Sequence, residues 1–155
     1  PHIGVITNIG EAHLENFKNI HGIAKAKSEI IENIKPGGTI ILNRDDKFFY
    51  YLFKKAKLYK LKIITFGTQK KSDVYLEKIT KKGNTSKFFL NIKNQKMDLE
   101  IGDLNIYNVL ASIAVLKALK IDILKETISN NDYIMIKGSN ATGLNRFSKK
   151  MIKGI

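Results

Sequence analysis

The chain has 155 residues, of which 43% are apolar, and it carries a formal net charge of +13 and no cysteine. This composition predicts one ordinary globular domain with a core, and it excludes disulfides, thiolate metal sites and cysteine nucleophiles. No apolar run approaches the roughly 20 residues of a membrane-spanning helix, and the first six residues lack the basic region of a signal peptide, so we expect a cytoplasmic location and no membrane partner.

The first part of the chain predicts alternating strands and helices. Short apolar runs indicate buried strands, and apolar residues at helical spacing indicate the helices between them. The expected elements are a strand at residues 3–7, a helix at 20–34, a strand at 39–42, a helix at 47–60 and a strand at 62–66. This order predicts a parallel sheet with helical crossovers.

The pattern changes after Gly67. Three short strands are expected next, as a small antiparallel excursion from the main sheet, followed by a helix and a last strand, loop and helix. The expected ranges are strands at 74–79, 87–92 and 97–101, a helix at 105–119, a strand at 133–136, a loop at 138–143 and a helix at 144–152. The fold class is therefore α/β.

A loop follows the first predicted strand, and it carries His13 and Glu15. In open α/β sheets ligands bind beyond the carboxyl ends of the strands, which is where Thr7 and Asn8 lead into this loop. Magnesium prefers oxygen ligands but accepts one imidazole when waters and substrate phosphates complete its shell. His13 is a candidate metal ligand, and the alternative is a structural or surface histidine.

Lys27 lies fourteen residues after His13, inside the first predicted helix. Most helical lysines are solvated, and an ammonium group repels a metal ion. If Lys27 is buried, however, it loses its proton more easily, and the neutral amine can take up carbon dioxide to form a carbamate, which is an oxygen donor. Both interpretations stay open from the residues alone.

Residues 6–15 and 22–30, with Ala-His-Leu-Glu at 12–15, resemble the central domain of the Mur ligase family, and within it the branch that adds D-alanyl-D-alanine. The resemblance implies that His13 binds magnesium. It also implies that Lys27 is carbamylated and supports a second magnesium ion, so that both residues are catalytic and metal-binding.

Two further stretches extend the resemblance. Residues 41–46 resemble the family's Leu-Asn-x-Asp-Asp strand end, and residues 101–112 resemble the start of a helix whose asparagines lie near the adenine. The resemblance implies that the nucleotide-binding residues are Asn43, Asp46, Asn105 and Asn108. An asparagine at a helix start is alternatively only a cap.

Residues 136–140 resemble a Lys-Gly-Ser segment near the C-terminus of the D-alanyl-D-alanine-adding enzymes, which implies substrate binding by Lys137 and Ser139. A plain strand-to-helix turn is the alternative. On the resemblance, residues 1–121 are the central, ATP-binding domain, and residues 122–155 are a remnant of an α/β C-terminal domain, so the chain is truncated and internally shortened.

The reaction that the resemblance implies uses ATP and magnesium. ATP phosphorylates the terminal carboxylate of a UDP-muramoyl tripeptide, and the amine of D-alanyl-D-alanine attacks the acyl phosphate. No G-x-x-x-x-G-K-[ST] phosphate loop is present in these 155 residues, so we expect the isolated chain to be inactive or nearly so. A non-catalytic nucleotide- or metal-binding module is an alternative.

The net positive charge makes nucleic-acid binding a third candidate function. Arginine is the preferred residue for bidentate contacts to phosphate and guanine, yet Arg44 and Arg146 are the only arginines, and the lysines are scattered along the sequence. We therefore favour a solvated, lysine-biased surface and expect no nucleic-acid partner. A sheet that lacks its phosphate-loop strand would leave an exposed edge, which makes self-association a hypothesis.

Overall fold

The computed structural model describes residues 1–10, 19–82, 85–93, 95–101 and 105–120. Their elements follow in the order β1 (Ile3–Ile6), α1 (Ile20–Glu32), β2 (Thr39–Asn43), α2 (Phe49–Leu58), β3 (Lys62–Gly67), β4 (Val74–Lys82), β5 (Thr85–Ile92), β6 (Gln95–Ile101) and α3 (Ile106–Ala118). The strands form a single mixed sheet in the order β1-β2-β3-β4-β5-β6.

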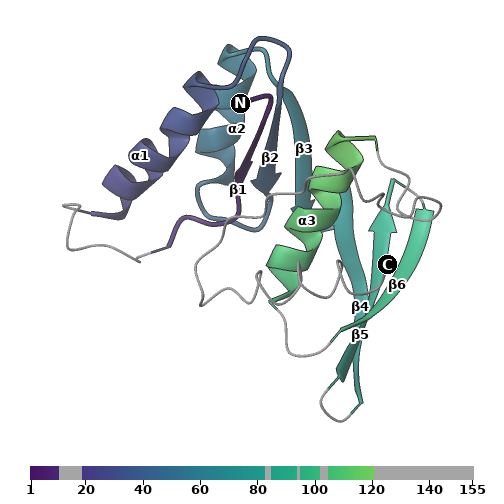
Figure 1. Cartoon of the computed structure of the whole chain (residues 1–155). Helices are drawn as coiled ribbons and strands as arrows, with labels where there is room; N and C mark the ends of the chain where they lie inside the picture. The colour runs from purple at the N-terminus through teal and green to yellow at the C-terminus, as the bar shows by residue number, and fades with distance from the viewer. Residues whose placement is uncertain (11–18, 83–84, 94, 102–104, 121–155) are drawn as a thin grey trace.

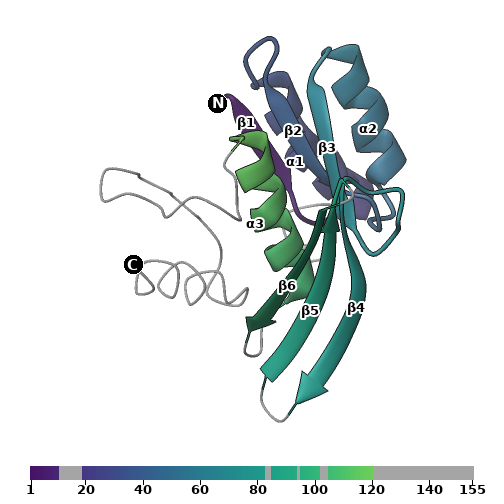
Figure 2. The same ribbon diagram turned by 90° about the vertical axis from the view of Figure 1, so that its right-hand side faces the viewer.

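The predicted βαβαβ unit is confirmed. β1 pairs with β2 and β2 with β3, all parallel, and α1 and α2 are the crossovers. Successive side chains of a strand point to opposite faces, so β2 needs apolar residues on both. Ile40 and Leu42 pack with α1 and α2, whereas Ile41 packs with α3. Figures 1 and 2 show α1 and α2 on one face of the sheet and α3 on the other.

The antiparallel strands are longer than expected, and they continue the main sheet. β4 joins β3 in parallel through only two residue pairs, Phe66 with Val74 and Gly67 with Tyr75. β4, β5 and β6 then pair antiparallel. The added residues at the strand ends are lysine, threonine, serine and glutamine, which carry no apolar alternation from which a strand could be predicted.

The helices agree with expectation to within two residues at each end. The N-cap of α1 is Asn19, whose side-chain oxygen accepts a hydrogen bond from the Gly22 N–H, and the N-cap of α3 is Asn105. In the described ranges no helix combines the length and apolar character needed to cross a membrane. The strand, loop and helix expected within 133–152 lie outside the described residues.

Candidate functional site

The carboxyl ends of β1 and β2 are tied together by two side chains from the end of β2. Asn43, only 7% exposed, donates from Nδ2 to the Thr7 carbonyl oxygen, 3.0 Å away. Asp46 accepts from the Ile9 N–H, with its Oδ2 at 2.7 Å. The loop after β1 is thereby fixed against the loop after β2, at the edge where parallel sheets bind ligands.

The Oδ1 atom of each of these two side chains also accepts a hydrogen bond from a backbone N–H. Asn43 Oδ1 accepts from the Asp45 N–H at 2.9 Å, and Asp46 Oδ1 accepts from the Phe48 N–H at 2.8 Å. Both groups therefore hold the shape of this edge. Their contact with a nucleotide stays a prediction.

Lys27 reaches the same edge from α1. Its Nζ donates a hydrogen bond to the carbonyl oxygen of Asn8, 2.9 Å away, and the residue is exposed. Burial, the condition under which an easily deprotonated lysine is expected, is thus not met: Lys27 lies on the same side of α1 as the core residues Ile23 and Ile31, four residues from each, but its side chain is exposed and reaches the Asn8 carbonyl. The position is nevertheless open to carbon dioxide from solvent.

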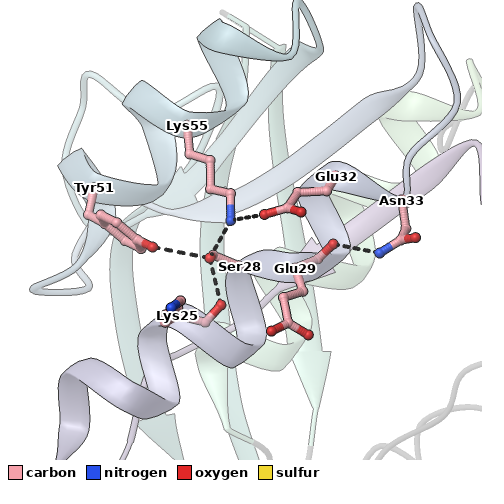
Figure 3. A network of polar contacts seen from close by, with 7 residues as sticks. All are labelled: Lys25, Ser28, Glu29, Glu32, Asn33, Tyr51 and Lys55. Atoms are coloured by element: carbon pink, nitrogen blue, oxygen red, sulfur yellow. Dashed lines mark hydrogen bonds and ion pairs between the residues drawn. The ribbon is translucent and has the colours of Figure 1, made fainter.

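The next residue, Ser28, lies at the centre of a polar cluster between α1 and α2 (Figure 3). Ser28 is fully buried. Its hydroxyl lies 2.7 Å from the Lys25 carbonyl oxygen, 3.2 Å from the Tyr51 hydroxyl and 2.8 Å from the Lys55 ammonium group. Lys55 also forms an ion pair with Glu32, one turn further along α1. The cluster therefore fixes how α1, and Lys27 with it, is rotated against α2.

A second carboxylate, Asp45, joins the ends of β2 and β3. Its Oδ2 accepts from the N–H and the hydroxyl of Thr68, at 2.6 and 2.9 Å. Gly67 allows this approach, since a Cβ there would lie 2.9–3.0 Å from the carboxylate. Among the described atoms, Asp45 Oδ1 is buried and has no hydrogen-bond partner of good geometry, and the Tyr107 phenol is near enough to interact with this carboxylate.

The N-terminus of α3 meets this carboxylate. Burial, and then the negative charge of Asp45, raise the pKa of the Tyr107 phenol. Asn105 is the N-cap of α3, and its Oδ1 accepts from the Tyr107 N–H at 2.9 Å. Asn108 lies in the first turn, where its N–H donates to the Asn105 carbonyl oxygen. The capping alternative for Asn105 is thus confirmed, while the nucleotide role of both asparagines stays a prediction.

His13, Glu15, Lys137 and Ser139 lie outside the described residues. Within the described ranges, no three His, Asp or Glu side chains come together as metal ligands. Carbonyl and carboxylate oxygens, such as those of Asn8 and Asp45, are the kind of ligand that magnesium prefers. Lys27 is hydrogen-bonded to Asn8, and because a protonated amine has no free electron pair, it would offer an oxygen ligand only as a carbamate.

Three residues at the carboxyl edge of the sheet, or in the α1–α2 cluster that positions Lys27, were not predicted as functional. Asp45 stands within the Asn-Arg-Asp-Asp sequence and could have been chosen with Asp46. Tyr107 and Ser28 give no such signal, because a tyrosine at a helix start and a serine inside a helix are common. Their importance comes from contacts with residues far away in the sequence.

Comparison with known proteins gives a consistent result. Residues 1–116 match the model of the Mur ligase middle domain. The chain is 33% identical, over 84% of its length, to UDP-N-acetylmuramoyl-tripeptide--D-alanyl-D-alanine ligase of Buchnera aphidicola. It is 34% identical, over 83% of its length, to UDP-N-acetylmuramate--L-alanine ligase of Caldicellulosiruptor saccharolyticus.

Among solved structures, the chain resembles MurF from Acinetobacter baumannii with a TM-score of 0.71 and 26% identity, over 90% of this chain and 32% of that one. The chain spans only 29% and 28% of the lengths of the two curated relatives. The similarity thus concerns one part of much longer proteins.

Proposed function

The chain belongs to the Mur ligase family, whose middle domain its residues 1–116 match, and from this premise we propose that it supplies the nucleotide- and metal-binding part of an ATP-dependent ligase in peptidoglycan precursor synthesis. The fold supports this, since its polar groups collect at the carboxyl edge of a parallel sheet, where α/β proteins bind ligands. The cytoplasm is the location that goes with this proposal.

The proposed reaction is the addition of D-alanyl-D-alanine to a UDP-muramoyl tripeptide through an acyl phosphate. Two observations support this branch: the Ala-His-Leu-Glu sequence at residues 12–15, and the similarity to a relative that carries this activity in its name. The L-alanine ligases, at a similar identity, are the competing branch. The complete reaction belongs to a ligase of the relatives' length, and we propose that these 155 residues alone are poorly active.

In this proposal His13 and carbamylated Lys27 hold the metal. Magnesium, when bound, neutralises charge on the transferring phosphoryl group. Asn43 and Asp46 keep the loop after β1 in place beside the nucleotide, and Asn105 and Asn108 approach it from the start of α3. Lys137 and Ser139 contact the substrate.

The observation that carries the proposal is the hydrogen bond from Lys27 to the Asn8 carbonyl, which brings the lysine to the ligand-binding edge. Calorimetric titration of the chain with ATP, in the presence and absence of magnesium and bicarbonate, tests it. We expect magnesium-dependent binding that is lost in Lys27→Gln. Lys25→Gln is the matched control, because Lys25 is an exposed lysine on the same helix. Equal binding by the two variants would contradict the proposal.

Self-association is proposed separately, through β1. In the described part of the chain β1 pairs with β2 alone, so its outer edge presents free backbone groups that a second copy can pair with. Sedimentation over a range of concentrations tests this. A strict monomer at the highest concentration would rule it out.

A further inference from the structure

The outer side of α2 gathers exposed apolar side chains. Among the described residues six large hydrophobic side chains are exposed, and four of them lie on α2 or at its C-cap. These four are Tyr50 at 72% exposure, Tyr51 at 43%, Leu58 at 79% and Tyr59 at 44%. Such a concentration on one helix indicates a contact surface rather than single, scattered apolar residues.

The same helix lies in the most basic stretch of the chain. Residues 47–72 contain eight lysines and no aspartate or glutamate. Lys55 is neutralised by Glu32, and the exposed lysines on or next to α2 are Lys47, Lys54, Lys57, Lys60 and Lys62. This stretch is therefore a local exception to the scattered distribution of the lysines in the rest of the sequence.

Helical geometry places these two kinds of side chain together. Tyr50, Lys54, Lys57 and Leu58 follow one another at spacings of four, three and one, which puts them on one side of α2. The opposite side packs into the core through Phe49, Leu52 and Ala56.

The neighbouring acidic groups do not cancel this charge. On α1, Glu32 is paired with Lys55, and the Glu29 carboxylate points away from Lys55 in Figure 3. Asp46, just before α2, accepts two backbone hydrogen bonds at the sheet edge. Figure 2 shows α2 at the outside of the molecule, with no described element over it.

We propose that this α2 surface, made of Tyr50, Lys54, Lys57, Leu58 and the lysines beside them, docks on the surface of a bilayer that contains anionic phospholipid. Lysines near such a surface are attracted by its negative potential, and tyrosine and leucine side chains enter the headgroup region. This departs from the sequence-based expectation of no membrane partner, which considered membrane-spanning segments and a signal peptide but not surface binding.

The chemistry of the surface favours lipid over nucleic acid. Base edges are read by asparagine and glutamine as well as by arginine and lysine, and of these four residue types α2 contains lysine alone. Arg44, close to its start, is stacked over the Phe49 ring, 5.1 Å from its centre. Single-stranded nucleic acid is bound along a basic groove with stacking platforms, whereas the outer side of an isolated helix is convex. Exposed Leu58 adds nothing to phosphate binding but suits a lipid interface.

Sedimentation with vesicles tests the proposal directly. The chain is mixed with vesicles of equal parts phosphatidylglycerol and phosphatidylcholine, or of phosphatidylcholine alone. We expect binding to the anionic vesicles only, with release by salt. Each lysine near the membrane contributes about a fivefold factor in partitioning, so Lys54→Gln with Lys57→Gln should weaken binding roughly 25-fold.

The matched control is Lys70→Gln with Lys71→Gln, which removes the same charge from the exposed loop between β3 and β4. It should keep binding near the unchanged level. All four lysines are exposed, so the fold is retained in both variants, as circular dichroism would verify. Tyr50→Trp should show a blue-shifted emission on binding, and Leu58→Ser should weaken binding without any change in charge.

Three results would overturn the proposal. The first is equal affinity for neutral and anionic vesicles. The second is an equal loss in the two lysine pairs, which would show a general effect of net charge. The third is displacement of the vesicles by a 20-nucleotide RNA that binds more tightly and depends on the same lysines, which would make the surface a nucleic-acid site. None of these results depends on ligase activity.

Discussion

The side chain of Lys27 and the backbone of Asn8 are joined by a hydrogen bond of 2.9 Å, although the two residues are nineteen positions apart. The bond links α1 to the segment after β1. An exposed lysine held in this way has its amine at the carboxyl edge of the parallel strands and still within reach of dissolved carbon dioxide.

We predict that Lys27 forms a carbamate in the presence of bicarbonate. With ¹³C-labelled bicarbonate, nuclear magnetic resonance of the chain should show a protein-bound carbamate carbon, which increases with magnesium because the metal stabilises the anionic form. Lys27→Arg should abolish the signal, since a guanidinium group does not deprotonate at accessible pH. A signal that survives in Lys27→Arg would show that another amine, a second lysine or the N-terminus, is modified.

Ser28→Ala should destabilise the chain by about 1–3 kcal/mol, since it removes a buried hydroxyl that lies within hydrogen-bond distance of two groups on α2. Urea unfolding followed by circular dichroism measures the change. Ser112→Ala is the control. Ser112 is a half-buried serine of α3 whose hydroxyl donates to the backbone of its own helix, at the Asn108 carbonyl oxygen, so its loss should cost little.

Gly67→Ala should also be destabilising, by about 1–3 kcal/mol, because the added Cβ would overpack against a side chain that cannot move freely. The atom would lie 2.9–3.0 Å from the Asp45 carboxylate, which two hydrogen bonds from Thr68 hold in place. A double-mutant cycle with Asp45→Ala separates the clash from other effects. The cost of Gly67→Ala should be smaller in the Asp45→Ala background, and an unchanged cost would show that the clash is not the cause.

Asn105 allows capping to be separated from nucleotide binding. Asn105→Ala should reduce stability by about 1 kcal/mol through loss of the cap, whereas Asn105→Asp keeps a side-chain oxygen acceptor and should be as stable as the unchanged chain. If the amide contacts the nucleotide, Asn105→Asp should nevertheless weaken ATP binding in calorimetry. Unchanged affinity in Asn105→Asp would leave Asn105 with a capping role alone.

Tyr107 predicts a change of stability at high pH. Burial and the charge of Asp45 raise the pKa of its phenol above the ordinary value of 10.0. The pKa of Tyr107 is higher in the folded state than in the unfolded state. The protonated phenol therefore adds to the free energy of unfolding below pH 10.0, and this stabilisation is lost as the pH rises from there through the folded-state pKa. Urea unfolding at pH values on both sides of 10.0 should show a steeper loss in the unchanged chain than in Tyr107→Phe. Equal slopes would exclude a shift at this residue.

The sequence predicts the fold well where apolar periodicity is strong. The buried strands β1 to β3 and the helices between them follow from it, because each must bury apolar side chains. The ends of β4, β5 and β6 could not be predicted, since strand pairing there extends through polar residues whose only common feature is a partner across the hairpin.

The candidate site is predictable in part. The order of strands and helices indicates that Asn43 and Lys27 belong to one edge of the sheet. It does not show that the Asn43 side chain is engaged by Thr7 and Asp45. The pairing of Ser28 with Lys55 is equally hidden, because these residues are 27 positions apart and each has the pattern of an ordinary helix residue.

The two-pair junction between β3 and β4 has a consequence for cooperativity. The βαβαβ half and the β4–β6 ribbon share few backbone hydrogen bonds there, so the sheet by itself would connect them weakly. α3 contacts β1, β2 and β3 on one side of the junction and β4 on the other, and Lys117 near its end donates to the Asp73 carbonyl beside β4. α3 thus connects the two halves of the sheet. Substitutions that weaken its packing would let the βαβαβ half and the β4–β6 ribbon unfold as separate units.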